Sequence, residues 1–306
     1  MPFRGVVLGS LNVDLVMRSP RLPVAGENII GGPFEMIPGG KGVNQAVALA
    51  RLGASVTLIG AVGADSFGAF MHEALARENL NLEHLCTLDA VATGTAIITV
   101  DDAGENTIVV ALGANDELTP ERARPALASI PGSDGLVMQL EAPVDTILEA
   151  ANTARAAGVP VTLNAAPPRP VPAELLEAVD TLIVNEFEAR ALAESGHDDL
   201  EMMARQLASC GPRQVVVTLG AAGAIWSDGT RSIRRPAFQV DARDATAAGD
   251  AFVAGFNLGD LSTGDPEEAL RLGAAAGALA ASRLGAMPSL PDRASVDAFL
   301  DGAAPR

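Results

Sequence analysis

The sequence predicts an α/β protein, a three-layer α/β/α sandwich with a mostly parallel central sheet and a small β lid. Strand-like apolar runs and helix-like segments alternate along most of the 306-residue chain, which is typical of repeated βα units. Several strand-like runs end on polar residues, as ligand sites of such folds require. Two segments, 13–38 and 93–110, break the alternation with short β-like runs. We expect one domain over residues 1–306, with these two segments forming the lid.

The alternation begins with residues 6–11, a continuous apolar run that closes on glycine and serine and predicts a buried parallel strand. The further strand candidates are residues 56–61, 136–140, 159–163, 181–184 and 215–219. The helix candidates are residues 43–52, 67–78, 120–128, 144–157, 186–193, 200–210 and 266–283. This order predicts helices on both faces of one sheet.

The two lid segments have different patterns. Residues 19–38 are rich in proline and glycine and too long for an ordinary βα loop, so we expect an excursion with its own strands, one of them at residues 27–30. Residues 93–110 predict a β-hairpin around the polar turn 101–106. Paired with each other, the two pieces would shield a site from water.

The composition limits the class of protein. With 48% hydrophobic residues the chain can bury a sizeable core, and its net charge of −17 argues against nucleic acid or anionic membranes as partners. Cys86 and Cys210 have no C-x-x-C partner, so neither a disulfide framework nor a zinc site is expected. The sequence has neither a signal-peptide pattern nor an uncharged stretch of transmembrane length. We therefore expect a cytoplasmic protein.

The segment 244–250, D-A-T-A-A-G-D, predicts a loop that becomes the first turn of a helix. The first N–H groups of a helix lack internal partners and carry the positive end of its dipole. Ala247, Ala248 and Gly249 are small enough to leave these donors open to an anion such as a phosphate. Asp250 adds a carboxylate beside that anion, which suits a base that deprotonates a hydroxyl during phosphoryl transfer. The alternative for Asp250 alone is that it only favours the helix N-terminus.

A second cluster of polar residues follows the first strand and precedes the first helix. Asn12 and Asp14 offer donors and acceptors that suit the hydroxyls of a polyol, although an Asx turn would also explain them. Lys41, the only lysine in the chain, lies in G-G-K-G-V-N-Q-A, where the glycines allow close approach and Asn44 points from the first helical turn. Its compact charge suits a migrating phosphoryl group or a sugar oxygen. The segment is not a Walker A loop, because glycine follows Lys41.

Other strand candidates end on polar or glycine residues. Glu141 follows 136–140, and Asn185 and Glu188 follow 181–184. The run 218–223, T-L-G-A-A-G, contains two glycines that would let a nucleotide lie against the backbone. Each of these residues alone is explained as a strand end or a helix cap, but together they lie at one edge of one sheet.

Taken together, these motifs resemble the ribokinase family of carbohydrate kinases, from residue 6 to about residue 300. The motifs that carry the resemblance are G-S-L-N-V-D, G-G-K-G-V-N-Q-A, M-Q-L-E, L-N-A-A-P, N-E-F-E-A, T-L-G-A-A-G and D-A-T-A-A-G-D. The resemblance implies a ribokinase-like fold and transfer of the γ-phosphate of Mg-ATP to the 5-hydroxyl of D-ribose. It also implies K⁺ as an activating monovalent cation.

The resemblance implies a role for each candidate residue. The sugar would contact Asn12, Asp14, Gly40, Lys41, Asn44, Glu141 and Asp250. ATP would contact Asn185, Glu188, Thr218, Gly220, Gly223 and Gly249. Asp250 would be the general base, with the backbone amides of residues 247–250 as the anion hole. The monovalent cation would lie among Asp244, Thr246, Ala280, Arg283, Gly285 and Ser289. Two positions depart from the family pattern: Ala245 replaces a β-branched residue, and Ala274 replaces a larger polar residue beside the adenine.

Other functions and partners remain as alternatives or expectations. The alternatives are a kinase for another sugar or a nucleoside, such as deoxyribose or fructose, and a sugar-binding regulator without chemistry. A Ser/His hydrolase is disfavoured, because His72, His84 and His197 lie outside any nucleophile motif. We expect a homodimer through the lid, whose exposed edge strands invite pairing with a second copy.

Overall fold

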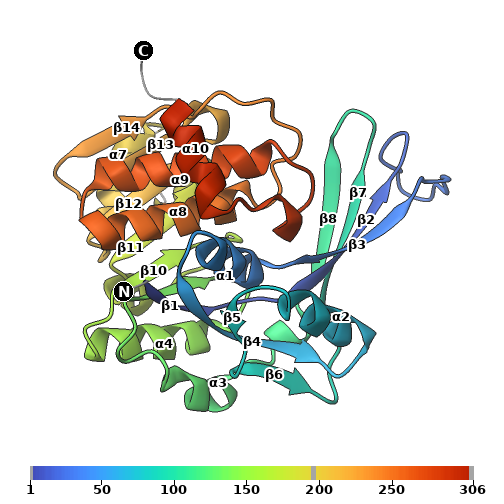
Figure 1. Ribbon diagram of the computed structural model, residues 1–306, viewed down its shortest axis with the longest axis horizontal. Coiled ribbons are helices and arrows are strands. Elements are labelled where there is room, and N and C mark those ends of the chain that lie inside the picture. Colours follow the sequence, from blue (N-terminus) through green and yellow to red (C-terminus); the bar gives the residue numbers. More distant parts are fainter. Residues whose placement is uncertain (1–2, 194–197, 303–306) are drawn as a thin grey trace.

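The protein, as a computed structural model, is described over residues 3–193 and 198–302 and contains two sheets of very different size (Figure 1). His197 lies outside the described residues. The larger sheet forms the body, and a smaller four-stranded sheet projects from it. The predicted fold class, a mostly parallel sheet between two layers of helices, is confirmed.

The larger sheet has the strand order β14-β13-β12-β11-β10-β9-β1-β4-β5, with β6 paired to β4. Its strands are β1 (Arg4–Leu8), β4 (Ser55–Gly63), β5 (Leu80–Asn81), β6 (Leu85–Leu88), β9 (Gly135–Gln139), β10 (Val161–Asn164), β11 (Thr181–Asn185), β12 (Gln214–Thr218), β13 (Ala224–Ser227) and β14 (Ser232–Arg235). From β12 to β5 and β6 all neighbours are parallel, while β13 and β14 add an antiparallel hairpin at one edge. The hairpin β13–β14 was not among the predicted strands.

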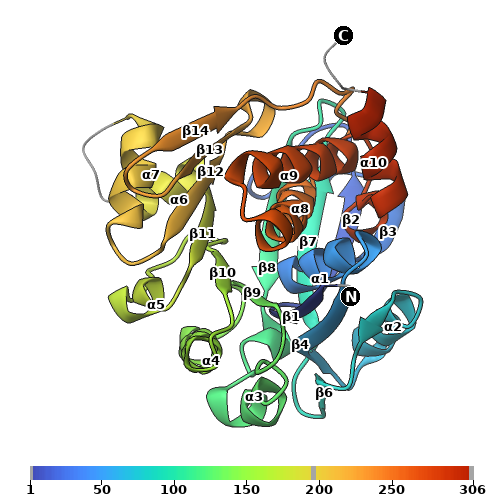
Figure 2. The ribbon, with the colours of Figure 1, turned by 60° about the vertical axis from the view of Figure 1, so that its left-hand side comes forward.

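Helices cover both faces of this sheet (Figure 2). They are α1 (Lys41–Arg51), α2 (Ser66–Leu75), α3 (Pro120–Leu127), α4 (Val144–Ala156), α5 (Ala173–Glu177), α6 (Glu186–Ala193), α7 (Leu200–Ala208), α8 (Ala248–Thr263), α9 (Pro266–Ala281) and α10 (Arg293–Gly302), with short 3₁₀ turns at Gly113–Asn115, Gly220–Ala222 and Met287–Ser289. One face packs against α1, α8 and α9, the other against α3, α4 and α7. Strand β1 shows why its sequence is continuously apolar: Val7 joins one core, Val6 and Leu8 the other.

Helix α8, which contains Asp250, packs closely against α9. A Cβ added at Gly255 would meet the backbone of Leu272 at 2.7 Å, and one added at Gly259 would meet Ala269 Cα at 2.6 Å. The glycines therefore let the two helices approach at backbone distance. This packing fixes the start of α8 relative to the sheet.

The smaller sheet has the order β3-β2-β7-β8 and consists of β2 (Asn12–Arg18), β3 (Phe34–Gly39), β7 (Gly94–Val100) and β8 (Asn106–Ala111). Strand β2 runs antiparallel to β3 and parallel to β7, and β7 and β8 form a hairpin. Asn12 and Asp14, for which an Asx turn was the alternative to a ligand role, are the first and third residues of β2, because the chain re-enters β structure directly.

Residues 27–30, expected as a strand, are irregular, and the strand that pairs with β2 begins later, at Phe34. Prolines at 20, 23 and 33 surround this segment and remove donors that a ladder needs. Among the described residues, no helix is long and apolar enough to cross a membrane.

Candidate active site

Asp250 lies in the first turn of α8, and polar side chains from several elements gather around it. Its side chain is 6% exposed; Asn44 Nδ2 donates to Oδ2 at 3.0 Å and Gln45 Nε2 donates to Oδ1 at 2.9 Å. Burial raises the pKa of Asp250 above its ordinary value, while the charge of Lys41 and these two hydrogen bonds act against that rise. Each carboxylate oxygen holds one donor and keeps a lone pair for another.

The backbone immediately before Asp250 has an unusual conformation. Ala247 precedes α8 with φ 59° and ψ 4°, in the left-handed region that favours glycine, and strain of this kind concentrates at functional sites. Nothing lies within 4 Å of a Cβ built on Gly249, so the first turn of the helix faces open space. Ala248 N donates to Ala245 O at 3.1 Å, which leaves the amides of Gly249 and Asp250 as the first-turn donors without a place in the helical ladder.

Close backbone packing at the start of α1 positions Lys41 and Asn44. Gly40 precedes the helix with φ 97°, and a Cβ there would meet Asn12 N and Ser10 O at 2.8 Å. A Cβ on Gly42 would overlap the backbone of Gly9 at the end of β1. The glycines of G-G-K-G are therefore required where the helix start meets the end of the central strand.

Lys41 lies among three acidic side chains. Burial alone would lower the pKa of Lys41, but the charges of Asp250, Glu141 and Glu188 outweigh it and raise the pKa. Lys41 is therefore a positive charge held between carboxylates from α8, from the end of β9 and from α6. An approaching phosphoryl group would meet this charge.

Asp14 and Glu141 form the acidic part of the site. Burial, followed by the charges of Glu141 and Asp250, raises the pKa of Asp14 to about 7. Glu141 Oε2 accepts hydrogen bonds from Ser10 Oγ and, at 3.3 Å, from Lys41 N. The three carboxylates are thus close enough to influence one another electrostatically.

Asn12 is held by Asn115, which lies more than a hundred residues away in the chain. Asn115 Oδ1 accepts from Leu11 N at 2.9 Å, so its Nδ2 faces Leu11 O at 3.1 Å and Asn12 Oδ1 at 2.8 Å. Asn12 Oδ1 accepts this bond, while its Nδ2 has no partner within residues 3–193 and 198–302 and can donate to a ligand. A Cβ on Gly94 would overlap both amides, so glycine is required there.

The remaining predicted nucleotide residues follow β11 and β12. Asn185 pairs in register with Thr218, and Asn185 and Glu188 exchange backbone-to-side-chain hydrogen bonds of 2.8 Å. Burial is the main reason that the pKa of Glu188 is raised, although the Asn185 amide and Lys41 oppose it. Gly223, with φ 104°, is packed against the backbone of residues 235–237, and Gly220 lies in the preceding 3₁₀ turn. Direct contact between this group and Asp250 is not observed; they share one sheet edge.

Of the residues predicted for a monovalent cation, Thr246 and Gly285 bond directly to Asp244. Asp244 Oδ1 accepts from Thr246 N and Oδ2 from Gly285 N, both at 2.9 Å. Burial would raise the pKa of Asp244, but these hydrogen bonds and the charge of Arg18 hold it below its ordinary value, so the group is ionised. Arg283 N donates to Ala280 O at 3.0 Å, and buried Ser289 donates to Ala286 O at 2.8 Å.

The strand order explains how these groups share one site. Along the carboxyl edge of the sheet, β12 and β11 carry Thr218 and Asn185, β10 carries Asn164, β9 leads to Glu141, and β1 leads to Ser10. Gln45, bonded to both Asn164 and Asp250, places the carboxylate above the middle of this row. The candidate site thus has one group of polar residues at β11–β12, where the nucleotide was predicted, and another at β9–β1, where the sugar was predicted.

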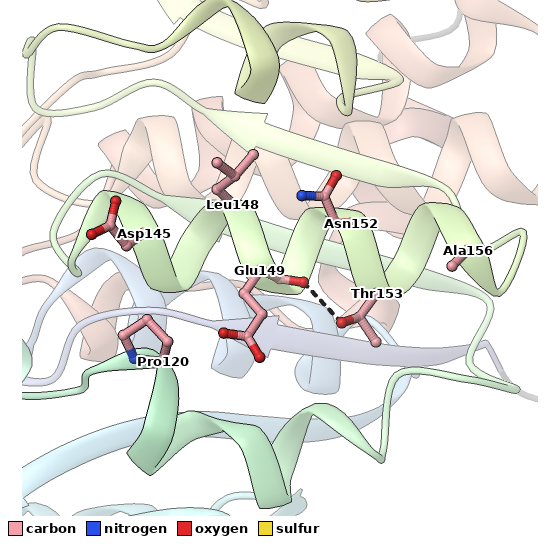
Figure 3. A pocket seen from close by; sticks show the side chains of 7 residues that line it. All are labelled: Pro120, Asp145, Leu148, Glu149, Asn152, Thr153 and Ala156. Atoms are coloured by element: carbon pink, nitrogen blue, oxygen red, sulfur yellow. Dashed lines mark hydrogen bonds between the residues drawn. The ribbon is translucent and has the colours of Figure 1, made fainter.

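A surface hollow of about 610 Å³ lies elsewhere, on helix α4 (Figure 3). It is lined by Pro120, Asp145, Leu148, Glu149, Asn152, Thr153 and Ala156. Thr153 Oγ1 donates to Glu149 O along the helix, at 2.8 Å. Two carboxylates without a basic side chain among the lining residues do not suit a phosphate ligand.

Four residues of the site were not among the predicted ones: Ser10, Gln45, Asn115 and Asn164. Ser10, Gln45 and Asn164 are polar residues inside the motifs G-S-L-N-V-D, G-G-K-G-V-N-Q-A and L-N-A-A-P, and this position was a usable signal. Asn115 has no such signal, since it follows the hairpin β7–β8 in an ordinary polar stretch and reaches Asn12 only through the tertiary fold.

The family model for the pfkB family carbohydrate kinases matches residues 4–293. The ribokinase of Haemophilus influenzae is 41% identical over 301 residues, which cover 97% of this chain and 98% of that protein. The ribokinase of Bacillus subtilis is 36% identical over 96% of this chain and 98% of its own. A solved structure of Arabidopsis thaliana ribokinase complexed with ribose and ATP has a TM-score of 0.91 at 32% identity, covering 98% of this chain and 99% of that one.

The carboxylate at the start of α8, the glycine-rich start of α1 and the polar strand ends define a phosphoryl-transfer class of site on a three-layer α/β/α fold. The chain belongs to the pfkB family of carbohydrate kinases. Within that family its similarity to ribokinases extends over nearly the whole chain.

Proposed function

We propose that this protein is an ATP-dependent sugar kinase that phosphorylates the 5-hydroxyl of D-ribose. The observation that carries the proposal is the position of Asp250, buried at an open helix start beside Lys41 and hydrogen-bonded to Asn44. The extended similarity to ribokinases supports ribose as the sugar.

The sugar is held by groups that still have hydrogen bonds to make. Asn44 Oδ1 is buried without a partner among the described residues, so it can accept from a sugar hydroxyl. Asn12 offers its Nδ2, and Asp14 and Glu141 offer carboxylate oxygens. This mixture of donors and acceptors matches the hydroxyls of a pentose, each of which can both donate and accept.

In the reaction, Asp250 accepts the proton of the attacking hydroxyl. Lys41 stabilises negative charge that develops on the transferred phosphoryl group, together with the first-turn amides of Gly249 and Asp250. The open space over Gly249 is where that group can approach the helix start. Binding ATP toward β11 and β12 places its γ-phosphate toward the sugar on the other side of Asp250.

A divalent metal accompanies ATP in such kinases. Within residues 3–193 and 198–302 no cluster of three or more His, Cys, Asp or Glu residues is arranged to hold a metal ion by itself. This fits Mg²⁺ bound largely by phosphates and water, with the buried carboxylate of Glu188 as the oxygen donor on the nucleotide side. Mg²⁺ neutralises phosphate charge when bound.

The proposal is tested by coupled detection of ADP release with a panel of D-ribose, 2-deoxyribose, D-fructose and a nucleoside. We expect sugar-dependent ADP release, with the highest kcat/KM for D-ribose and phosphate at O5. A higher kcat/KM for deoxyribose, fructose or the nucleoside would assign another sugar or nucleoside kinase. Sugar binding by calorimetry without ADP release would favour a sugar-binding regulator.

The cluster around Asp244 supports activation by K⁺. Asp244 is ionised beside the segment that leads to Ala247, so a cation bound there would steady the left-handed turn before α8. We expect kcat to rise when K⁺ replaces a large organic cation at equal ionic strength. Equal rates in the two salts would contradict this site.

The small sheet supports both a lid and a homodimer. On the face opposite Asp14, the register aligns Leu15 with Met36 and Ile97, and Ile97 with Val109. Ile97 is 58% and Val109 69% exposed, an apolar surface that a second copy would cover. We expect a dimer by light scattering and a monomer for Ile97→Lys; an unchanged mass for this variant would contradict pairing through this face.

A further inference from the structure

A chain of buried amides lies beneath Asp250. Gln139 Nε2 donates to Gln45 Oε1 at 2.6 Å, and Gln45 Nε2 donates to Asp250 Oδ1 at 2.9 Å and to Asn164 Oδ1 at 3.0 Å. Asn164 Nδ2 in turn donates to Ile183 O at 3.1 Å. Gln45 and Gln139 are completely buried, so neither can reach a substrate directly.

The direction of every amide in this chain is fixed from one end. The carbonyl of Ile183 can only accept, so Asn164 must turn its nitrogen to Ile183 and its oxygen to Gln45. Gln45 must then present its nitrogen to Asn164 and, from the same nitrogen, to Asp250. If Gln45 were flipped, its oxygen would face the oxygens of Asn164 and Asp250. Its nitrogen would face the nitrogen of Gln139, so two donors would meet with no acceptor between them.

We propose that Gln45 is a positioning residue for the base: held by Gln139 and Asn164, it fixes the orientation of the Asp250 carboxylate and favours its charged form. The inference rests on the proposed function of Asp250 and adds the residue that prepares it. Asn44 also donates to Asp250, but it faces the sugar as well. Gln45 serves Asp250 from beneath, independently of whether sugar is bound.

The charges that face Asp250 determine the sign of the effect. Lys41 favours its ionised form, whereas burial and the carboxylates of Asp14, Glu141 and Glu188 favour its protonated form. The hydrogen bond from Gln45 also favours the ionised form of Asp250. Removing its N–H takes away part of that stabilisation, so the pKa of Asp250 rises. Because the base works only when ionised, activity is then lost first at low pH.

The test is Gln45→Met, which keeps the length of the side chain and removes both donor and acceptor. We expect kcat to fall about 10- to 100-fold, as displaced catalytic groups do. The acid limb of the kcat profile should move up by about one pH unit. The KM for ribose should stay within threefold of the unmodified protein's, because Gln45 does not touch the sugar.

Gln214→Met is the matched control. Gln214 Nε2 also donates to an aspartate on α8, Asp260 Oδ2 at 2.7 Å, but at the opposite edge of the sheet. We expect its kcat and its acid limb to equal those of the unmodified protein. A shifted acid limb in Gln214→Met would mean that any loss of a buried glutamine perturbs the profile, and this would overturn the inference.

Gln139→Met provides a second, milder variant that leaves Gln45 in place and removes the donor that orients it. We expect a loss of about three- to tenfold in kcat, as for one buried hydrogen bond, and a shift of the acid limb in the same direction. If Gln45→Met does not fold, as judged by the lack of a cooperative thermal transition, Gln139→Met becomes the test of the positioning role. A profile of Gln139→Met identical to that of the unmodified protein would then overturn the inference.

The result separates this inference from the function beneath it. If the unmodified protein releases no ADP with any sugar, the proposed function fails. If it is active and Gln45→Met lowers only stability, or raises only KM, with an unmoved acid limb, the function stands and the positioning role of Gln45 is wrong.

Discussion

Helix α8 carries a buried or half-buried aspartate near each end, and each aspartate accepts a hydrogen bond from a glutamine. Asp250 accepts from Gln45 at 2.9 Å and Asp260 accepts from Gln214 at 2.7 Å. Burial is the first cause of a raised pKa at both. The same three components, a helix, a carboxylate and an amide, therefore occur at both edges of the sheet, yet only one end has the features of an active site.

The surroundings of Asp250 and Asp260 differ in the sign of the helix dipole and in whether a nearby hydrogen-bonding group lacks a partner. Asp250 lies in the first turn, where the free N–H groups favour an anion, whereas Asp260 lies in the last turn, where the dipole disfavours a carboxylate. Gln214 also donates to Thr181 Oγ1 and accepts from Trp226 Nε1, so the groups at that end bond to one another. Beside Asp250, Asn44 Oδ1 has no partner among the described residues. An unpaired acceptor at the positive end of a helix, rather than a shifted pKa, marks the site.

The largest effect expected from this comparison is that of Asp250→Asn. We expect kcat to fall by at least about 10²- to 10⁴-fold, the contribution of a positioned base, while the affinity for sugar changes little. Asp260→Asn is the matched control, with kcat within twofold of the unmodified protein's. It should raise the free energy of unfolding by about 0.3–1 kcal/mol, because a negative charge leaves the negative end of the helix. Both are measured by ADP release and by thermal unfolding; retained activity in Asp250→Asn would refute its role as the base.

The comparison also shows what sequence patterns can predict. The alternation of apolar runs predicted the parallel strands β1 and β4 and those from β9 to β12, because a strand buried on both faces must be continuously apolar. The motif around Lys41 predicted a close approach of backbone, since glycines at 40 and 42 have no other local purpose. Features fixed by local chemistry were therefore visible in the sequence.

Features fixed by long-range contacts were not. Asn115 bonds to Asn12 across more than a hundred residues, and its neighbours carry no pattern that distinguishes it from a loop asparagine. The hairpin β13–β14 was missed because its strands are short and one of them contains two arginines. The segment 244–250 pointed to Asp250, but the hydrogen bonds that Gln45 and Gln214 make to Asp250 and Asp260 depend on α1 and β12 and are seen only in the fold.

A smaller effect is expected from the acidic group on the sugar side. With a pKa of about 7, Asp14 is partly protonated in the free protein at neutral pH. Sugar hydroxyls that donate to the carboxylate favour its ionised form, so binding should release up to about half a proton at pH 7 and tighten between pH 6 and 8. Titration calorimetry in buffers of different ionisation enthalpy measures this release. Binding heats independent of the buffer would contradict it, and Asp14→Asn should abolish the dependence.

The smallest effect on activity is expected at the other end of α8. Gln214→Met leaves Trp226 Nε1–H and Asp260 without their common partner, so the free energy of unfolding should fall by about 1–3 kcal/mol while kcat is unchanged. Loss of this donor raises the folded-state pKa of Asp260 further above its unfolded value. The folded state then binds more protons than the unfolded one, so stability declines as pH rises from about 4 through that folded pKa, and more steeply than in the unmodified protein. Urea unfolding between pH 4 and 8 measures the slope. A stability loss that is the same at every pH would mean that Gln214 acts by packing alone, and that the likeness between the two ends of the helix is one of shape rather than of charge.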